Sequence, residues 1–271
     1  MQVTSSQRSL FPVPDEWSSR PRGDWSGALV YTVLGTLFAG IGIVGLAGGQ
    51  RLGFLCAELI ACGMILDICS ILRSARLRTM TTAGVAPFLR DGVLTIRRDR
   101  LMRGFDIAST ATFGAGALLF ALGAWRDAVH ISLASEHAEN LYPPVAFVVG
   151  ILYIGHAVRA ANGDSAWMIV SERGISVPSH RTANGLDWGI VTEVTPVLTK
   201  GDKRNGAWMS LRPGERYDQI RVDESCLGGP ATFWLIDFYH RHPELRAELG
   251  GTAVIRRLRD GSLVPDAHRN V

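Results

Sequence analysis

Two acidic residues, Glu58 and Asp67, lie inside a long apolar stretch, and their type and position point most directly to chemistry. A carboxylate inside a bilayer is costly, and such residues commonly bind ions or relay protons. A separation of nine residues on a helix places the two side chains about half a turn apart, so they do not form one paired-carboxylate site. One reading is an ion or proton path that uses both acids. The alternative is structural, because both lie near a helix end, where Asp67 could meet Arg73 or the membrane interface.

Basic residues form two further candidate sites, for anionic lipid headgroups or for a partner. The first cluster precedes an apolar stretch, where each arginine adds about 1 kcal/mol of attraction toward an anionic leaflet. Its alternative reading is a signal that only orients the chain. The second is a polar loop, whose alternative reading is a solvated hairpin tip. The first cluster consists of Arg97, Arg98, Arg100 and Arg103, and the second consists of Lys200, Lys203 and Arg204.

No pattern in the sequence specifies a catalytic residue, a cofactor or a metal. The four cysteines lack paired CxxC spacing, and the His240–His242 pair with Glu244 points to different sides of a helix. There is no Gly-rich phosphate loop, nucleophile elbow or HExxH sequence. The balance of 28 basic and 25 acidic residues is also too even to indicate nucleic acid as a partner.

Hydropathy divides the chain into a membrane part and a soluble part. Residues 25–50 contain no charged side chain, which is too long a run for a signal peptide, and Trp17 and Trp25 suit the aqueous interface. Four spans of about the length that crosses a bilayer are predicted. Residues 48–51 form a tight turn after the first span, and Pro143-Pro144 opens the fourth. The predicted spans cover 27–48, 52–72, 107–125 and 144–161.

The arginine distribution predicts the orientation of these spans. Residues 73–106 contain eight arginines against three acids, whereas residues 126–140 contain one arginine against three acids. Short loops rich in arginine stay in the cytoplasm. We therefore expect a protein of the bacterial plasma membrane with both termini in the cytoplasm.

Small residues recur at seven-residue spacing in the first span, at Gly35, Gly42 and Gly49. This spacing returns to nearly the same helix face and allows another helix to approach closely. The partner helix belongs either to the same chain, to a second copy of it or to another membrane protein.

Beyond residue 163 the pattern becomes that of an antiparallel sheet followed by helices. Residues 188–194 are expected to alternate, with Trp188, Ile190, Thr192 and Val194 on one face. An aromatic helix over 231–242 opens at Gly228-Gly229-Pro230, and Thr252 is expected to cap a short helix over 252–258. The predicted strands cover 167–170, 174–177, 188–194, 207–211 and 219–222.

Two sequence elements resemble bacterial pleckstrin-homology-like (PH-like) domains. These are Glu-Arg-Gly-Ile-Ser-Val at 172–177 and Leu-Asp-Trp-Gly-Ile-Val at 186–191, followed by the closing helix. Residues 242–250 are similar to the tails of actinobacterial membrane proteins that carry such domains. The resemblance covers about residues 165–250 and implies a binding or assembly module with no catalytic motif.

A weak internal repeat connects the two halves of the chain. Residues 90–93 and 172–175 share an Arg-containing, Gly-centred pattern, and each follows a predicted helical hairpin. If the repeat is real, residues 93–97 add a strand to the C-terminal sheet. The predicted parts are, in chain order, a cytoplasmic segment (1–26), a transmembrane hairpin (27–72), a basic loop with a possible β-hairpin (73–106), a second transmembrane hairpin (107–162), a PH-like domain (163–260) and a tail (261–271).

The expected fold is thus a membrane bundle of four helical spans with a cytoplasmic α+β PH-like domain. The first functional hypothesis is a non-catalytic accessory or scaffold subunit that binds a partner protein or anionic lipid. The others are a small proton- or ion-coupled transporter using Glu58 and Asp67, and a membrane enzyme that modifies lipid. The partners expected are the bilayer itself and a membrane protein or a second copy of the chain.

Overall fold

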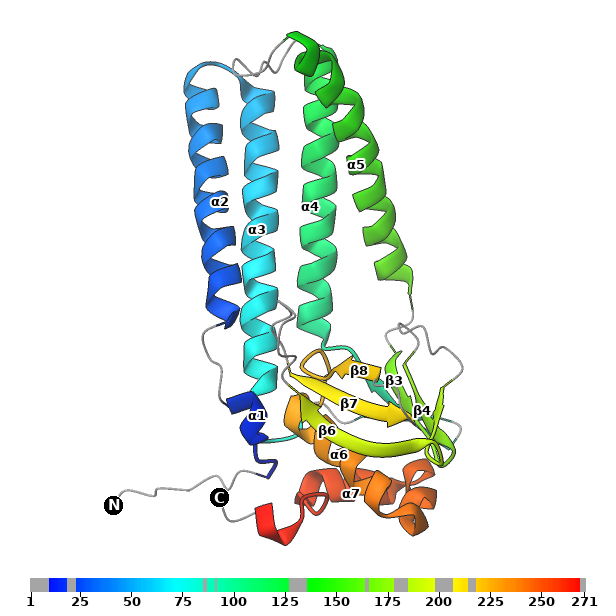
Figure 1. Ribbon diagram of the computed structural model, residues 1–271. Helices are drawn as coiled ribbons and strands as arrows, with labels where there is room; N and C mark the ends of the chain where they lie inside the picture. The colour runs from blue at the N-terminus through cyan, green and yellow to red at the C-terminus, as the bar shows by residue number, and fades with distance from the viewer. Residues whose placement is uncertain are drawn as a thin grey trace, which may run out of the picture. The chain divides into compact units, whose positions relative to one another are not determined.

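The computed structural model describes residues 10–18, 23–84, 87–90, 92–126, 136–163, 166–177, 185–197, 207–213 and 218–268. The chain divides into two compact units (Figure 1). The bundle unit comprises Asp24–Leu72 and Leu101–Asp164. The sheet unit comprises Met1–Gly23, Arg73–Arg100 and Ser165–Val271.

Among the described residues, four helices are long and apolar enough to cross a membrane, which confirms the predicted membrane protein. Large apolar side chains such as Leu29, Val44 and Leu152 are 64%, 73% and 65% exposed, as suits contact with lipid. The helices are α2 (Gly23–Ala47), α3 (Arg51–Arg78), α4 (Arg100–Trp125) and α5 (Glu136–Asn162).

Glycines allow neighbouring helices of the bundle unit to pack closely. A Cβ on Gly42 of α2 would lie 3.3 Å from the Ala57 Cβ of α3, and a Cβ on Gly35 would lie 3.5 Å from the Met64 Cβ. Gly35 and Gly42 therefore form an α2–α3 seam within the chain. Gly49 does not belong to it, because it lies in the turn after α2 with φ +81° and nothing within 4 Å of its Cβ position.

The start of the fourth helix differs from the prediction. Pro143 and Pro144 lie inside α5, which begins at Glu136. A proline removes the hydrogen bond to the residue four positions earlier, but it does not stop a helix that already has turns on both sides. The predicted opening at 143–144 was therefore wrong.

The sheet unit contains two antiparallel sheets. The first has the order β1-β2-β3-β4-β5, and the second has the order β6-β7-β8. Strand β2 pairs with β3 through partners such as Ile96 and Met168, which confirms that residues 93–97 join the C-terminal sheet. The strands are β1 (Phe88–Arg90), β2 (Val93–Arg97), β3 (Ala166–Val170), β4 (Gly174–Ser176), β5 (Leu186–Asp187), β6 (Val191–Val197), β7 (Trp208–Pro213) and β8 (Asp218–Arg221).

The alternation predicted for residues 188–194 was wrong. Residues 188–190 form a turn, and Ile190 is 50% exposed. The β6–β7 register then shifts between Val191 and Glu193. A bulge of this kind resets the alternation, so Val191 and Val194 both point into the core.

Helix α6 (Gly229–Arg241) contributes most of its side chains to the core of the sheet unit. A 3₁₀ helix, η1 (Pro243–Gly250), and α7 (Thr252–Asp260) follow it. Thr252 is the first residue of α7 rather than its cap, because Gly251 takes the cap position and no side chain bonds there. The part predicted as a tail adds Leu263 and Val264, both almost completely buried, and a short 3₁₀ turn, η2 (Asp266–His268).

The core of the sheet unit also uses residues that precede the first span. Phe11 is 0% exposed, and Trp17, in the short helix α1 (Asp15–Ser18), is 3% exposed. Trp17 is therefore a core residue and not an interfacial anchor, while the side chain of Trp25 lies outside the described residues. Leu77 of α3 and Leu94 and Ile96 of β2 are also completely buried. Three separate segments thus build one core, which is wider than the predicted segment 163–260.

Candidate functional site

The arginine cluster makes contacts within the protein. Arg97 lies over the Phe88 ring at 5.1 Å, and Arg98 forms a 3.0 Å ion pair with Glu224. Arg103 donates hydrogen bonds to the carbonyl oxygens of Ala160, Ala161 and Gly163 at the end of α5. Such bonds satisfy carbonyls that a helix end leaves without partners. Arg100 is exposed. The cluster therefore has a structural use that the sequence did not show.

A buried polar network lies at the centre of the sheet unit. The Asp223 carboxylate is 0% exposed and accepts hydrogen bonds from Ser74 Oγ at 2.7 Å, Arg221 Nε at 2.7 Å and the Ala207 backbone N–H at 3.3 Å. Nearby, Arg73 donates two hydrogen bonds to Asp99, at 3.0 and 2.6 Å. Arg73 thus pairs with Asp99 and not with Asp67. The network fixes the last turns of α3 to the loop after β8.

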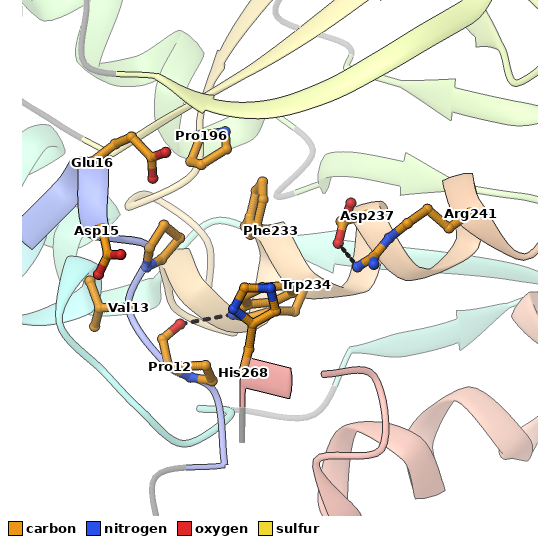
Figure 2. A pocket seen from close by; sticks show the side chains of 11 residues that line it. Pro12, Val13, Asp15, Glu16, Pro196, Phe233, Trp234, Asp237, Arg241 and His268 are labelled. Atoms are coloured by element: carbon orange, nitrogen blue, oxygen red, sulfur yellow. Dashed lines mark hydrogen bonds and ion pairs between the residues drawn. The ribbon is translucent and has the colours of Figure 1, made fainter. Parts of the chain in front are cut away.

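The sheet unit also contains a groove, lined by residues 12–16 and by one side of α6 (Figure 2). Its volume is about 380 Å³, within the range of ligand-binding clefts. The apolar lining includes Pro12, Val13, Pro196, Phe233 and Trp234, and the described ionisable lining residues are Asp15, Glu16, Asp237, Arg241 and His268.

Aromatic contacts hold the two walls of this groove together. The Trp234 Nε1 donates a 2.8 Å hydrogen bond to the Pro12 carbonyl oxygen. Trp17 stacks edge-on against Phe233 with ring centroids 5.7 Å apart, and its Nε1 donates to the Trp208 carbonyl oxygen at 3.2 Å. The His268 ring lies 5.3 Å from the Trp234 ring. The groove is therefore a fixed feature of the folded unit.

Among the described lining residues there are three carboxylates and one arginine, so acidic side chains outnumber arginine in this part of the lining. Asp15 and Glu16 are exposed at the rim. Asp237 is 13% exposed and forms an ion pair with Arg241. Burial raises the pKa of the Asp237 carboxyl above its ordinary value, and the Arg241 charge opposes this effect. No serine, threonine or cysteine occurs among the described lining residues.

The two intramembrane acids face different neighbours, as their spacing indicates. Glu58 Oε1 lies 3.1 Å from the position of a Cβ on Gly42 of α2. Asp67 Oδ1 accepts a 2.6 Å hydrogen bond from Ser109 Oγ of α4. Asp67 also lines a cavity of about 410 Å³ in the bundle unit, and Glu58 does not.

Two features remain, the predicted basic loop and the possibility of a metal site. Lys200, Lys203 and Arg204 lie outside the described residues. Within the described ranges, no group of three or more histidine, cysteine, aspartate or glutamate side chains is placed to hold a metal ion.

No protein-family model, curated protein or solved structure matches this chain significantly.

Sequence reasoning missed the groove because its lining comes from residues 12–16, 196, 233–241 and 268. The sequence did contain one signal for the groove, in the segment Phe11-Pro-Val-Pro-Asp-Glu-Trp17. Two prolines between bulky aromatic residues favour an extended segment that packs against a surface.

Proposed function

We propose that this chain is a non-catalytic membrane scaffold or accessory subunit whose sheet unit binds a partner protein in the groove lined by residues 12–16 and α6. The observation that carries the proposal is the combination of an aromatic and proline-rich wall with three carboxylates. Binding surfaces commonly place an apolar anchor in such a pocket and use surrounding charge for selectivity. The expected partner segment therefore has an apolar side chain next to lysine or arginine.

The charge of the groove favours a protein over an anionic lipid. Asp15, Glu16 and Asp237 would repel a phosphate headgroup, whereas they attract a basic segment. Arg98 and Arg103, two of the candidates for headgroup binding, already contact Glu224 and the end of α5. Lipid binding is therefore the less favoured outcome.

The partner is proposed to be a membrane protein or a second copy of the chain. The sheet unit is covalently joined to four apolar helices, which raises its effective concentration toward other proteins of the same bilayer. The PH-like resemblance supports a binding role, and two antiparallel sheets followed by α6 are compatible with it.

The proposed orientation places the sheet unit in the cytoplasm of a bacterium. The arginine excess in residues 73–106 supports it. Because residues 10–18, 73–100 and 166–268 share one compact unit, they must lie on the same side of the bilayer.

Cysteine labelling tests this topology in a variant without the four native cysteines. A membrane-impermeant maleimide added to intact cells should modify Ser135→Cys, in the loop with few arginines. It should modify Thr82→Cys and Asp260→Cys, both exposed in the sheet unit, only after the cells are opened. If both Thr82→Cys and Asp260→Cys were labelled from outside, the orientation would be the reverse of the proposed one. If only one of them were labelled, the two positions would not belong to a single unit.

Charge reversal tests the groove in the full-length protein. Asp15→Lys with Glu16→Lys should reduce recovery of the partner in purification from the native host by roughly tenfold or more, because close charge pairs at interfaces contribute strongly. Glu172→Lys with Asp260→Lys, at exposed positions outside the groove lining, gives the same change in net charge and should leave recovery unchanged.

A compensating charge reversal in the partner completes the test of the groove. Reversing a basic residue of the identified partner should restore binding to the groove variant. Equal loss in both double variants would contradict the assignment of the groove, and so would a partner that remains bound after charge reversal. Recovery of anionic lipid alone, with no protein, would favour the lipid reading.

A further inference from the structure

The bundle unit contains a cavity that the proposed scaffold role does not use. Its volume is about 410 Å³, and all four helices contribute to its lining. Among the described residues of this lining, Asp67 is the only charged one. The other lining residues are Tyr31 of α2, Ile60 of α3, Ser109, Thr110, Phe113 and Ala117 of α4, and Val149 and Tyr153 of α5.

Two reciprocal hydrogen bonds join α3 to α4, and one of them positions the Asp67 carboxylate. Ser109 of α4 donates to Asp67 of α3 at 2.6 Å, and Ser70 of α3 donates to Asp106 of α4 at 2.7 Å. The pairs fix α3 against α4 and hold Asp67 at the wall of the cavity. The Ser109 bond uses only Oδ1, and the described residues supply no hydrogen bond to Oδ2. Asp67 therefore retains an oxygen that can accept from a ligand.

The remaining wall is aromatic and apolar. Phe113 and Tyr153 stack edge-on with centroids 6.2 Å apart, and Tyr31 lines the same space from α2. Aromatic faces attract cations, most strongly where water is excluded. A carboxylate beside three aromatic rings therefore suits an ammonium group attached to an apolar body.

We propose that this cavity binds a small organic cation, with the ammonium group on Asp67 and the apolar part against Tyr31, Phe113 and Tyr153. The volume falls within the range of small-molecule sites. Divalent metal sites in proteins are built mainly from carboxylate and carbonyl oxygens, whereas the described lining residues provide a single carboxylate. The bundle segment of α3 ends at Leu72, five residues after Asp67. Asp67 therefore lies about 8 Å along the helix from this end.

Binding to the purified full-length protein in detergent tests the proposal, with 2-phenylethylamine as the probe. The neutral alcohol 2-phenylethanol has nearly the same shape and serves as the matched ligand. The amine should show saturable binding by calorimetry and the alcohol should bind roughly tenfold more weakly or worse, because a charge-assisted hydrogen bond is lost. Asp67→Asn should weaken amine binding by a similar factor.

Further variants separate the site from general effects on folding. Glu58→Gln changes the other intramembrane acid, which does not line the cavity, and should leave amine binding unchanged. Tyr153→Leu should weaken amine binding while the Asp67 carboxylate remains. Thermal unfolding identifies any variant that has not folded, and if Asp67→Asn is one of them, the Tyr153→Leu and amine–alcohol comparisons decide. Any of three results would overturn the proposal. The amine and the alcohol bind equally well, the amine binds native protein and Asp67→Asn equally well, or the amine shows no saturable binding up to about 10 mM.

Discussion

A fragment that contains only residues 163–260, the segment predicted as the PH-like domain, should be unfolded in solution. Such a fragment lacks Phe11, Trp17, Leu77, Leu94 and Ile96, which are between 0% and 3% exposed in the sheet unit. Burial of a large apolar side chain contributes roughly 1.5–3 kcal/mol, so their loss removes a large part of the 5–15 kcal/mol that typically stabilises a domain. It also leaves β3 without its β2 neighbour. Circular dichroism and amide proton dispersion measure the result.

The matched control joins residues 10–18 and 73–100 to residues 163–268 through flexible linkers. This fusion supplies every described segment of the sheet unit without the spanning helices and should fold. A cooperative thermal transition in the 163–260 fragment alone would contradict the account of a core built from three segments.

Replacement of Asp223 by alanine should be the most destabilising single change in the polar network of the sheet unit. It removes an entirely buried carboxylate that accepts hydrogen bonds from Ser74, Arg221 and the Ala207 N–H. Breaking a buried pair costs about 3–5 kcal/mol, and because the Arg221 side chain is 31% exposed we expect a loss near the lower value. The corresponding fall in melting temperature is roughly 6–12 °C.

A surface ion pair provides the comparison. Glu193 and Arg212 are 3.9 Å apart with half-exposed side chains, so Glu193→Ala should change stability by less than about 1 kcal/mol. Both variants are measured by thermal unfolding of the full-length protein in detergent. Equal melting temperatures for the two would show that the Asp223 network contributes no more than a surface pair.

The parts of the fold that follow from local pattern could be predicted from the sequence. The four spans are set by long runs of apolar residues, and α6 is marked by Gly228-Gly229-Pro230 and its aromatic residues. The strand over residues 93–97 was also predicted, because a repeated glycine pattern connected it to the C-terminal sheet. These features depend on neighbouring residues or on a visible repeat.

The features that depend on distant contacts could not be predicted. Trp17 suited the interface by composition, but its indole ring packs on Phe233, more than two hundred positions away. Arg103 suited a headgroup site, yet its guanidinium binds the end of α5. The groove needs the N-terminal segment, α6 and His268 together, and no local spacing connects them.

Site-specific photocrosslinking in the native host most directly tests the central claim that a protein partner occupies the groove. A photoreactive amino acid replaces Val13, which lines the groove, or Asp260, which is exposed on α7 and does not. The account predicts that Val13 crosslinks to one protein, at a segment with an apolar residue beside lysine or arginine. This adduct should disappear with Asp15→Lys and Glu16→Lys, and Asp260 should give no such adduct. Crosslinking from Asp260 but not from Val13, or adducts only with lipid, would contradict it.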